Sequence, residues 1–347
     1  MKKEITLRDA LFLTHPKPQN DEQKELFKKI AENTLEVPYT WEVELSKLGQ
    51  DNYETEEAKT QAFTKKWEEL IDSKKIGYMA LLRNLRNILE AHVSREHVTK
   101  VTDYLSNPVA VKKSKQLPFR FFSAYLSLES VASTRKNQVL KALEDAVKIS
   151  IDNVVGMDCD VLIASDVSAS MESTISGKSQ VQFYDIGLLL GQLLALKAPN
   201  NILGFFGDTW KAVNIAPNNP LHNTLQLHER EGEVGYSTNG YKVIEWLIEN
   251  NVKMDKVFIF TDCQMWDSEY GYGGNTQDFS KYWNNYKKIA PNAKLYLFDV
   301  SGYGNTPIDV RQGEVHLIAG WSDKVFDMLE AIEQGETAVK VINQIEI

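Results

Sequence analysis

The chain has 347 residues, 43% of them apolar and 25% charged, which are the proportions of a folded globular protein and exclude a mostly disordered chain. At roughly 100–200 residues per domain, this length predicts two domains. The sequence has no apolar run near the roughly 20 residues of a membrane span and no signal-peptide pattern at its amino terminus. We therefore expect no membrane partner. Its two cysteines, Cys159 and Cys263, are too few for a disulfide framework, so we expect a cytoplasmic location.

The net charge of −9 by itself argues against a nucleic-acid partner, but the charge is not evenly distributed along the chain. Residues 1–150 hold 25 basic and 22 acidic side chains, whereas residues 151–347 hold 14 and 26. The positive excess is concentrated in residues 71–150, which hold 14 basic and 7 acidic side chains. Such an asymmetry predicts that the two parts of the chain bind different partners.

The first part, residues 1–155, has apolar residues at helical spacing and few strand-like runs. Polar or proline-bearing joints separate the helices at residues 15–18, 51–59 and Asn107-Pro108. A row of helices, each with one apolar face, predicts an all-α, HEAT-like helical repeat domain. The expected helices span residues 24–37, 64–75, 77–92, 95–107, 117–132 and 137–150.

The second part, residues 156–347, alternates short apolar runs with helical patterns. Buried strands that alternate with helices are typical of an α/β doubly wound, Rossmann-like domain with a parallel sheet. The expected strands span residues 160–165, 201–207, 211–216, 256–262, 294–300 and 314–320. The expected helices span residues 184–198, 239–251, 278–290 and 322–335, the last with Ser322 as its cap.

Oxygen-bearing side chains follow the strands of this second part. Asp166, Ser168 and Ser170 come after the first strand, Asp262 ends the strand at 256–262, and Thr238 precedes a helix. Because ligands of open α/β sheets bind at the carboxyl ends of the strands, we expect these side chains to meet at one edge. Carboxylate and hydroxyl oxygens suit Mg²⁺ or another divalent cation. The alternative is a structural N-capping turn beside a strand-end aspartate.

Only two of these five side chains carry charge, so a bound cation would stay partly positive and would attract an anionic ligand from outside. That ligand would be an acidic residue of a protein partner or a phosphate. The pattern Asp166-x-Ser168-x-Ser170, then Thr238, then Asp262 resembles the metal-ion-dependent adhesion site (MIDAS) of von Willebrand factor A domains. All five positions of that family pattern are filled.

Segments of the first part resemble the TROVE domain of the Ro ribonucleoprotein family. They include Met79 to Asn87 (MALLRNLRN), the WEEL run at 67–70, Leu117 to Phe121 (LPFRF) and Thr40 to Glu44 (TWEVE). Residues 8–18 (RDALFLTHPKP) resemble a helix that runs into a Ser/Thr-His-x-Lys-Pro turn of the family. The order also agrees, because the family places a von Willebrand factor A domain directly after the helices.

This resemblance implies a non-catalytic RNA-binding protein that binds small or misfolded non-coding RNA, including single-stranded RNA, with an exoribonuclease as a further partner and no DNA. His15 and Lys17 fall on the turn that resembles the family's RNA-contact region, and phosphate contacts elsewhere need Lys and Arg. The candidate RNA contacts are Arg8, His15, Lys17, Arg83, Arg86, Lys112, Lys113, Lys115 and Arg120.

Structural alternatives stay open for several of these candidates. His15 would serve as a helix cap, Arg83 and Arg86 (three positions apart on one helical face) would pair with carboxylates, and Lys112 to Lys115 would form a solvated loop. The aromatic residues Phe119, Phe121 and Phe122, and the leucines Leu82 and Leu85, are expected in the core.

The sequence also departs from the family. About 155 residues precede the A domain, roughly half of a full family ring, so we expect an open arc, closure through oligomerisation, or a fragment. Phe12 is apolar where relatives can carry a basic residue, which weakens the expectation for structured RNA.

Enzyme functions have weaker support. Ser176 to Ser179 (SGKS) resembles the end of a P-loop, but Glu172 stands where the first glycine is required. Two other functions remain as alternatives to RNA binding. One is a protein-interaction scaffold that uses the metal site alone, and the other is a phosphoesterase that uses Asp166 and Asp262.

Overall fold

The computed structural model describes residues 6–35, 39–152, 154, 156–264, 277–302, 304, 307–309, 314–321 and 324–333. These residues form two compact units, Met1–Ile76 and Gly77–Ile347. The predicted cap Ser322 lies outside the described residues. In the described ranges, we find no helix with the length and apolar character that crossing a bilayer requires.

The first compact unit consists of two helix pairs, in which α1 packs against α2 and α3 against α4. Each helix begins at a residue whose side-chain oxygen accepts a hydrogen bond from the first turn, which satisfies a backbone donor that helix geometry leaves unpaired. The bounds are α1 (Leu7–Thr14), α2 (Asp21–Glu32), α3 (Trp41–Gln50) and α4 (Glu56–Asp72).

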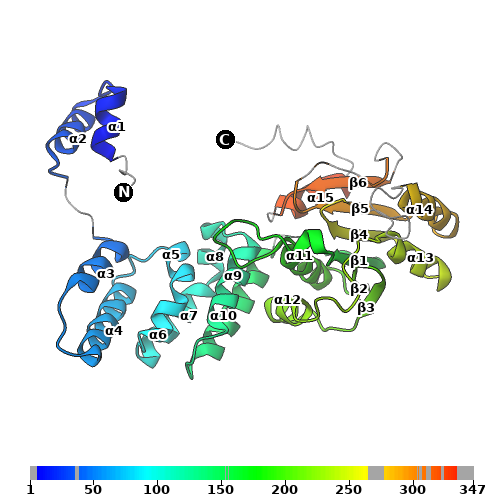
Figure 1. Ribbon diagram of the computed structural model, residues 1–347, viewed down its shortest axis with the longest axis horizontal. Coiled ribbons are helices and arrows are strands. Elements are labelled where there is room, and N and C mark those ends of the chain that lie inside the picture. The colour runs from blue at the N-terminus through cyan, green and yellow to red at the C-terminus, as the bar shows by residue number, and fades with distance from the viewer. Residues whose placement is uncertain are drawn as a thin grey trace. The chain divides into compact units, whose positions relative to one another are not determined.

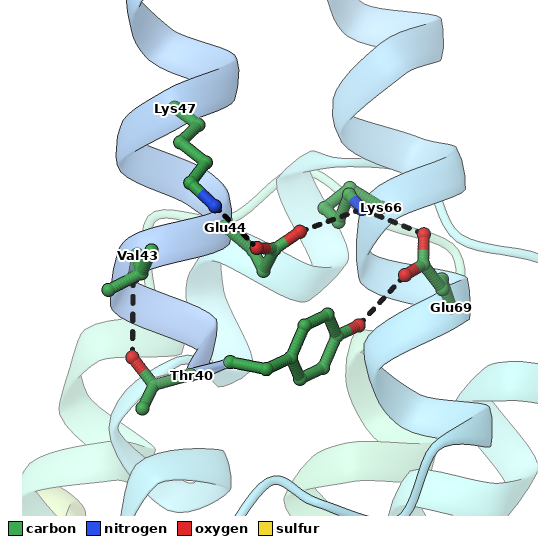
Figure 2. Close-up of polar contacts among 7 residues, drawn as sticks. Thr40, Val43, Glu44, Lys47, Lys66 and Glu69 are labelled. Atoms are coloured by element: carbon green, nitrogen blue, oxygen red, sulfur yellow. Dashed lines mark hydrogen bonds and ion pairs between the residues drawn. The ribbon is translucent and has the colours of Figure 1, made fainter. Parts of the chain in front are cut away.

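A polar network (Figure 2) joins α3 to α4, and an aromatic pair adds to it. Lys66 Nζ lies 3.2 Å from Glu44 Oε2 and 2.8 Å from Glu69 Oε2, and the Tyr39 hydroxyl donates to Glu69 Oε1 at 2.8 Å. The rings of Trp41 and Trp67 stack beside this network with centroids 6.5 Å apart. Two of the segments that resemble the TROVE domain, TWEVE and WEEL, therefore pack against each other.

The second compact unit begins with a helical region and continues into a sheet covered by helices (Figure 1). Its helical core contains Leu82, Leu85, Phe119, Phe121 and Phe122, as the sequence predicts. The bounds in the helical region are α5 (Tyr78–Arg83), α6 (Leu85–Glu90), α7 (Arg95–Leu105), α8 (Pro108–Ser114), α9 (Pro118–Leu128) and α10 (Lys136–Ser150).

One prediction about these helices is wrong, and one helix is not predicted. The helix expected at 77–92 is divided at Asn84, whose side chain donates to the Ala80 carbonyl at 2.8 Å and accepts from Asn87 at 2.8 Å. Such local hydrogen bonds compete with the helix backbone. The joint expected at Asn107-Pro108 does separate two helices, because α7 ends at Leu105 and α8 begins at Pro108. The short helix α8 itself is not predicted, although the Asn107 side chain caps it at 3.0 Å from the Ala110 nitrogen and proline suits the first helical position.

The sheet has six strands in the order β3-β2-β1-β4-β5-β6. All neighbouring pairs are parallel except β2 and β3, which are antiparallel. A short reversal at residues 207–209 permits this hairpin at the edge, where the sequence predicts a parallel strand. The bounds are β1 (Val161–Asp166), β2 (Asn201–Phe206), β3 (Trp210–Val213), β4 (Lys256–Thr261), β5 (Lys294–Asp299) and β6 (Val315–Ala319).

Helices cover both faces of the sheet (Figure 1). Alternate strand residues such as Leu162 and Ile259 pack with α13 and α14, while Ile163 and Phe260 on the other face contact α11. The outer surface of α11 and α12 in turn packs against α9 and α10 of the helical region. The remaining bounds are η1 (Ala169–Glu172, a 3₁₀ turn), α11 (Phe183–Lys197), α12 (Pro220–His228), α13 (Tyr241–Glu249), α14 (Gln277–Ile289) and α15 (Lys324–Glu333).

The predicted fold class, a helical region followed by an α/β doubly wound domain, is confirmed by this architecture. The HEAT-like repeat and the domain boundary between residues 155 and 156 stay predictions.

An ion pair between α11 and α12 predicts a pH-dependent stability. His228 Nδ1 lies 2.7 Å from the buried Asp185 Oδ1, and this hydrogen bond raises the pKa of His228, although partial burial opposes the rise. Glu231 and Glu229 raise the pKa further. A group whose pKa is raised by folding adds stability below its unfolded pKa, about 6.5 for histidine, and loses it as the pH rises through the folded pKa.

We therefore expect the difference in unfolding free energy between the wild type and His228→Gln to be larger at pH 6 than at pH 9. Urea titrations at the two pH values measure it. Equal differences at both pH values would show that the ion pair does not contribute.

Candidate functional site

The first candidate site lies at the carboxyl end of β1, which ends in the fully buried Asp166. Asp166 Oδ1 accepts a hydrogen bond from the Ser168 backbone N–H at 2.9 Å, and Oδ2 accepts one from the Thr261 hydroxyl at 2.6 Å. Thr261 is the last residue of β4, so this second bond joins the ends of two neighbouring parallel strands. The hydroxyls of Ser168 and Ser170 lie 3.2 Å apart in the loop after β1.

Asp262, the residue after β4, brings a second buried carboxyl to this edge. Its Oδ1 accepts a hydrogen bond from the Gln264 backbone N–H at 3.0 Å. Its Oδ2 is buried and has no hydrogen-bond partner among the residues that the structure describes. A buried carboxylate oxygen without a partner is costly, and a bound cation would remove that cost. The residues present therefore fit the divalent cation that the MIDAS resemblance implies.

The raised pKa values of the two carboxyls also fit a cation at this edge. Burial and the neighbouring Asp262 raise the pKa of Asp166 to about 7. Burial also raises the pKa of Asp262, while the Gln264 hydrogen bond and the nearby Ser170 hydroxyl oppose that rise. A divalent cation beside both carboxyls would favour their ionised forms. No group of three or more His, Cys, Asp or Glu side chains in the described ranges is placed to hold a metal.

Backbone hydrogen bonds hold the loop that carries Thr238 at the same edge of the sheet. The Ala169 backbone N–H donates to the Tyr236 carbonyl at 3.0 Å, and the Asn239 N–H donates to the Gly207 carbonyl at the end of β2, also at 3.0 Å. Thr238 itself is buried. The loops that carry Ser168, Ser170 and Thr238 are thereby held side by side across the ends of β1 and β2.

Three residues that support this loop were not predicted from the sequence. Gly235 has a φ of +78°, and a side chain at Gly207 would meet the Gly235 carbonyl oxygen, so both positions require glycine. Asp208 Oδ1 accepts the Ser237 backbone N–H at 2.8 Å and orients the turn before Thr238. The sequence signal for Gly207 and Asp208 is a Gly-Asp pair directly after an apolar strand, which is also common in ordinary turns.

Cys263, next to Asp262, lacks the character of a nucleophile. Its side chain is buried, and burial raises the pKa of the thiol well above its ordinary value. Because only the thiolate is strongly nucleophilic, this cysteine is a small core residue.

In the first compact unit, three candidate RNA contacts lie on α1 and the turn after it. Arg8 places its guanidinium 5.7 Å from the centre of the Phe12 ring. His15 has a φ of +43° and its backbone N–H donates to the Leu11 carbonyl at 3.0 Å, which is the helix-capping geometry of the structural alternative. Lys17 is exposed beyond the helix.

In the second compact unit, two candidates form ion pairs. Arg86 Nε lies 2.8 Å from Glu90 Oε1, and Lys112 Nζ lies 3.3 Å from Asp152 Oδ2. Both pairs are exposed and therefore weak.

The other four candidates, Arg83, Lys113, Lys115 and Arg120, are exposed, and no ion pair forms to them in the described part of the chain. Arg83 and Arg120 line the same pocket between α5 and α9. Arg83 ends α5 and Arg86 lies in the first turn of α6, so they belong to two short helices that Asn84 separates.

Comparison with protein-family models gives two successive matches. Residues 31–153 match the TROVE domain, and residues 160–332 match the Ro60 vWA domain, a von Willebrand factor A domain.

Individual relatives match shorter parts. The chain is 36% identical over 104 residues to telomerase protein component 1 of Rattus norvegicus and of Mus musculus, which covers 30% of this chain and 4% of each relative. It is 25% identical over 203 residues to the RNA-binding protein RO60 of Deinococcus radiodurans, which covers 55% of this chain and 38% of that protein. The chain thus spans well under two thirds of the length of these relatives.

Among solved structures, the Deinococcus radiodurans RO (RSR) protein superposes with a TM-score of 0.55 at 18% identity. The superposition covers 95% of this chain and 71% of that chain. At this identity the likeness concerns the fold.

Proposed function

Because the chain belongs to the family in which a TROVE domain is followed by a Ro60-type von Willebrand factor A domain, we propose that it is a non-catalytic, RNA-binding component of a ribonucleoprotein. Its RNA would be a small or misfolded non-coding RNA with single-stranded segments. The name of the Deinococcus relative, RNA-binding protein RO60, supports this proposal.

One observation on this chain carries the proposal. Residues 104–128 contain four basic side chains and no Asp or Glu, and three of the four, Lys113, Lys115 and Arg120, are exposed without an ion pair among the described residues. Exposed cations without acidic neighbours are available to phosphate, whereas Lys66 of the first unit is held between two glutamates. The helical region of the second unit therefore supplies the electrostatic attraction.

The A domain would have a separate task. Asp166, Ser168, Ser170, Thr238 and Asp262 would hold a divalent cation such as Mg²⁺, which supplies a positive centre for an anionic ligand. Asp166 and Asp262 bring the negative charge, and the hydroxyls complete the oxygen shell without cancelling the charge of the cation. The ligand from outside would be an Asp or Glu of a protein partner, and an exoribonuclease is the partner class that the resemblance suggests.

Removing the lysines on α8 and at its carboxyl end, Lys112, Lys113 and Lys115, tests the RNA-binding part of the proposal. For single-stranded RNA, log K falls with log salt by about 0.7 for each phosphate neutralised. We expect Lys112/Lys113/Lys115→Ala to reduce this slope by about 1–2, with Lys112 contributing least because it pairs with Asp152. Fluorescence anisotropy with a labelled single-stranded RNA at several salt concentrations measures the slope.

The matched control is Lys24/Lys28/Lys29→Ala, which removes the same charge from three exposed lysines of α2. An equal slope in both triple variants would show that α8 has no particular role. If the wild type fails to bind RNA even at low salt, RNA binding is refuted and the scaffold alternative, which uses the metal site alone, replaces it.

A further inference from the structure

A pocket of about 210 Å³ lies between α5 and α9 within the second compact unit. Arg83 at the end of α5 and Arg120 in the first turn of α9 both line it. Gln116 and Ser123 add further hydrogen-bonding groups, and Leu82 and Ala124 form part of an apolar wall. Two arginines that are 37 positions apart in the sequence thus line one hollow of the surface.

Neither arginine forms an ion pair in the ranges that the structure describes. The Arg120 guanidinium carbon lies 4.8 Å from the centre of the Phe119 ring. In an ordinary surface pocket, two neighbouring arginines repel each other unless an anion lies between them. No lining residue is an Asp or Glu, so the pocket itself supplies no such anion.

The position of Arg120 on its helix strengthens this argument. A helix amino terminus carries a partial positive charge, so cations are unfavourable in the first turn and anions are favourable there. The first turn of α9 holds Arg120 and no acidic residue, and no side chain caps it because Leu117 occupies the N-cap position. The unpaired arginines and the uncapped helix end therefore both favour an anion at this pocket.

The polar lining further narrows the class of ligand. Arg83 and Arg120 can only donate hydrogen bonds, and guanidinium groups match the paired oxygens of phosphate or carboxylate. The Gln116 amide nitrogen already donates to the Ser114 carbonyl at 2.9 Å, and the Ser127 hydroxyl donates to the Ala124 carbonyl at 2.7 Å. Two positive charges are thus the main feature that a ligand meets, and the volume is below the roughly 300 Å³ of sites for larger organic molecules.

We propose that this pocket binds one phosphate group of the RNA backbone, with Arg83 and Arg120 contacting the same phosphate. The proposal rests on the proposed RNA-binding function and adds a specific site to it. Lys113 and Lys115, exposed just before α9, would then attract the neighbouring phosphates of the strand without a pocket of their own. The pocket would fix the position of the RNA, while the lysines would add affinity that depends on salt.

A double-mutant cycle on the full chain tests the shared phosphate. The variants are Arg83→Gln, Arg120→Gln and the double variant, with Arg95→Gln as a control that removes the same charge from an exposed arginine of α7. Binding of a labelled single-stranded RNA is measured by anisotropy at fixed low salt. We expect each single variant to bind about 10-fold more weakly, as for the loss of a charge-assisted hydrogen bond, and Arg95→Gln to change affinity less than about 3-fold.

The decisive result is the double variant. If both arginines hold one phosphate, losing either removes most of the contact, so the double variant should bind only about 10- to 30-fold more weakly rather than about 100-fold. A product of the two single effects would show that the arginines bind separate phosphates and would overturn the proposal. So would single variants that match Arg95→Gln. Failure of the wild type to bind RNA would instead refute the proposed function, so the two failures are distinguishable.

Discussion

Glu144→Ala should lower the free energy of unfolding by about 2–4 kcal/mol. Glu144 lies on α10 and is buried. Its two carboxylate oxygens accept the backbone N–H groups of Leu221 at 3.1 Å and His222 at 2.7 Å, in the first turn of α12. The substitution would leave both donors without an acceptor at a helix end that favours negative charge.

Urea denaturation of the two proteins measures this loss. Asp145→Ala is the matched control, because Asp145 is the next residue on α10 and forms an exposed pair with Lys148 at 3.1 Å. Exposed pairs of this kind contribute about 0–1 kcal/mol. If Glu144→Ala and Asp145→Ala destabilise the protein equally, the cap supplied by Glu144 has no special weight.

Glu144 also links the helical region to the sheet domain. The residue belongs to the helical region, whereas α12 belongs to the covering layer of the sheet domain. Phe119 of α9 and Trp321, which follows β6, form a second link with ring centroids 4.6 Å apart. The helical region from α9 onward and the A domain should therefore unfold in one transition, which circular dichroism and tryptophan fluorescence would report at the same denaturant concentration.

Asp166→Ala should remove Mg²⁺ binding from the A domain. The substitution deletes one of only two charged oxygen donors and also the acceptor of the Thr261 hydroxyl. We expect the affinity for Mg²⁺ to fall by at least about 100-fold, and the thermal stabilisation by millimolar Mg²⁺ to disappear with it. Isothermal titration calorimetry and a thermal melt with and without Mg²⁺ measure the two effects.

Asp160→Ala provides the control for the metal experiment, since this exposed aspartate precedes β1 at the opposite end of the strand. It should retain the Mg²⁺ affinity of the wild type. Unchanged affinity in Asp166→Ala would refute the ligand assignment. Phosphodiester hydrolysis that is present in the wild type and absent in Asp166→Ala would instead favour the phosphoesterase alternative.

The sequence predicts the position of the two carboxyls at one edge of the sheet, but not the residues that support this edge. Asp166 and Asp262 follow apolar runs, and the rule that parallel strands end at a common edge was sufficient to place them together. The hydrogen bond from the Thr261 hydroxyl to Asp166 is not predicted, because the sequence of a strand does not show which neighbouring side chain its last residue contacts. The Gly207–Gly235 approach was missed because it joins two loops that are far apart in the chain.

The helical region shows where local patterns are insufficient. Apolar spacing predicts long amphipathic segments such as α7 and α10, whereas it does not predict α8, which has only seven residues after an Asn-Pro pair that also starts turns. Asn84 divides a segment whose apolar spacing is continuous, so its effect depends on side-chain hydrogen bonds that periodicity does not record. Arg83 and Arg120 line one pocket because α5 packs on α9, and this tertiary contact cannot be read from local patterns.

The salt dependence of RNA binding by the full chain and by Asp166→Ala tests most directly whether the two parts of the chain have separate tasks. If the helical region binds RNA and the A domain binds a cation, the two proteins should bind a single-stranded RNA with the same steep inverse dependence on salt. A wild-type chain that does not bind RNA at low salt would contradict this expectation. A variant that loses RNA binding while it remains folded would also contradict it, because the metal site would then be part of the RNA site.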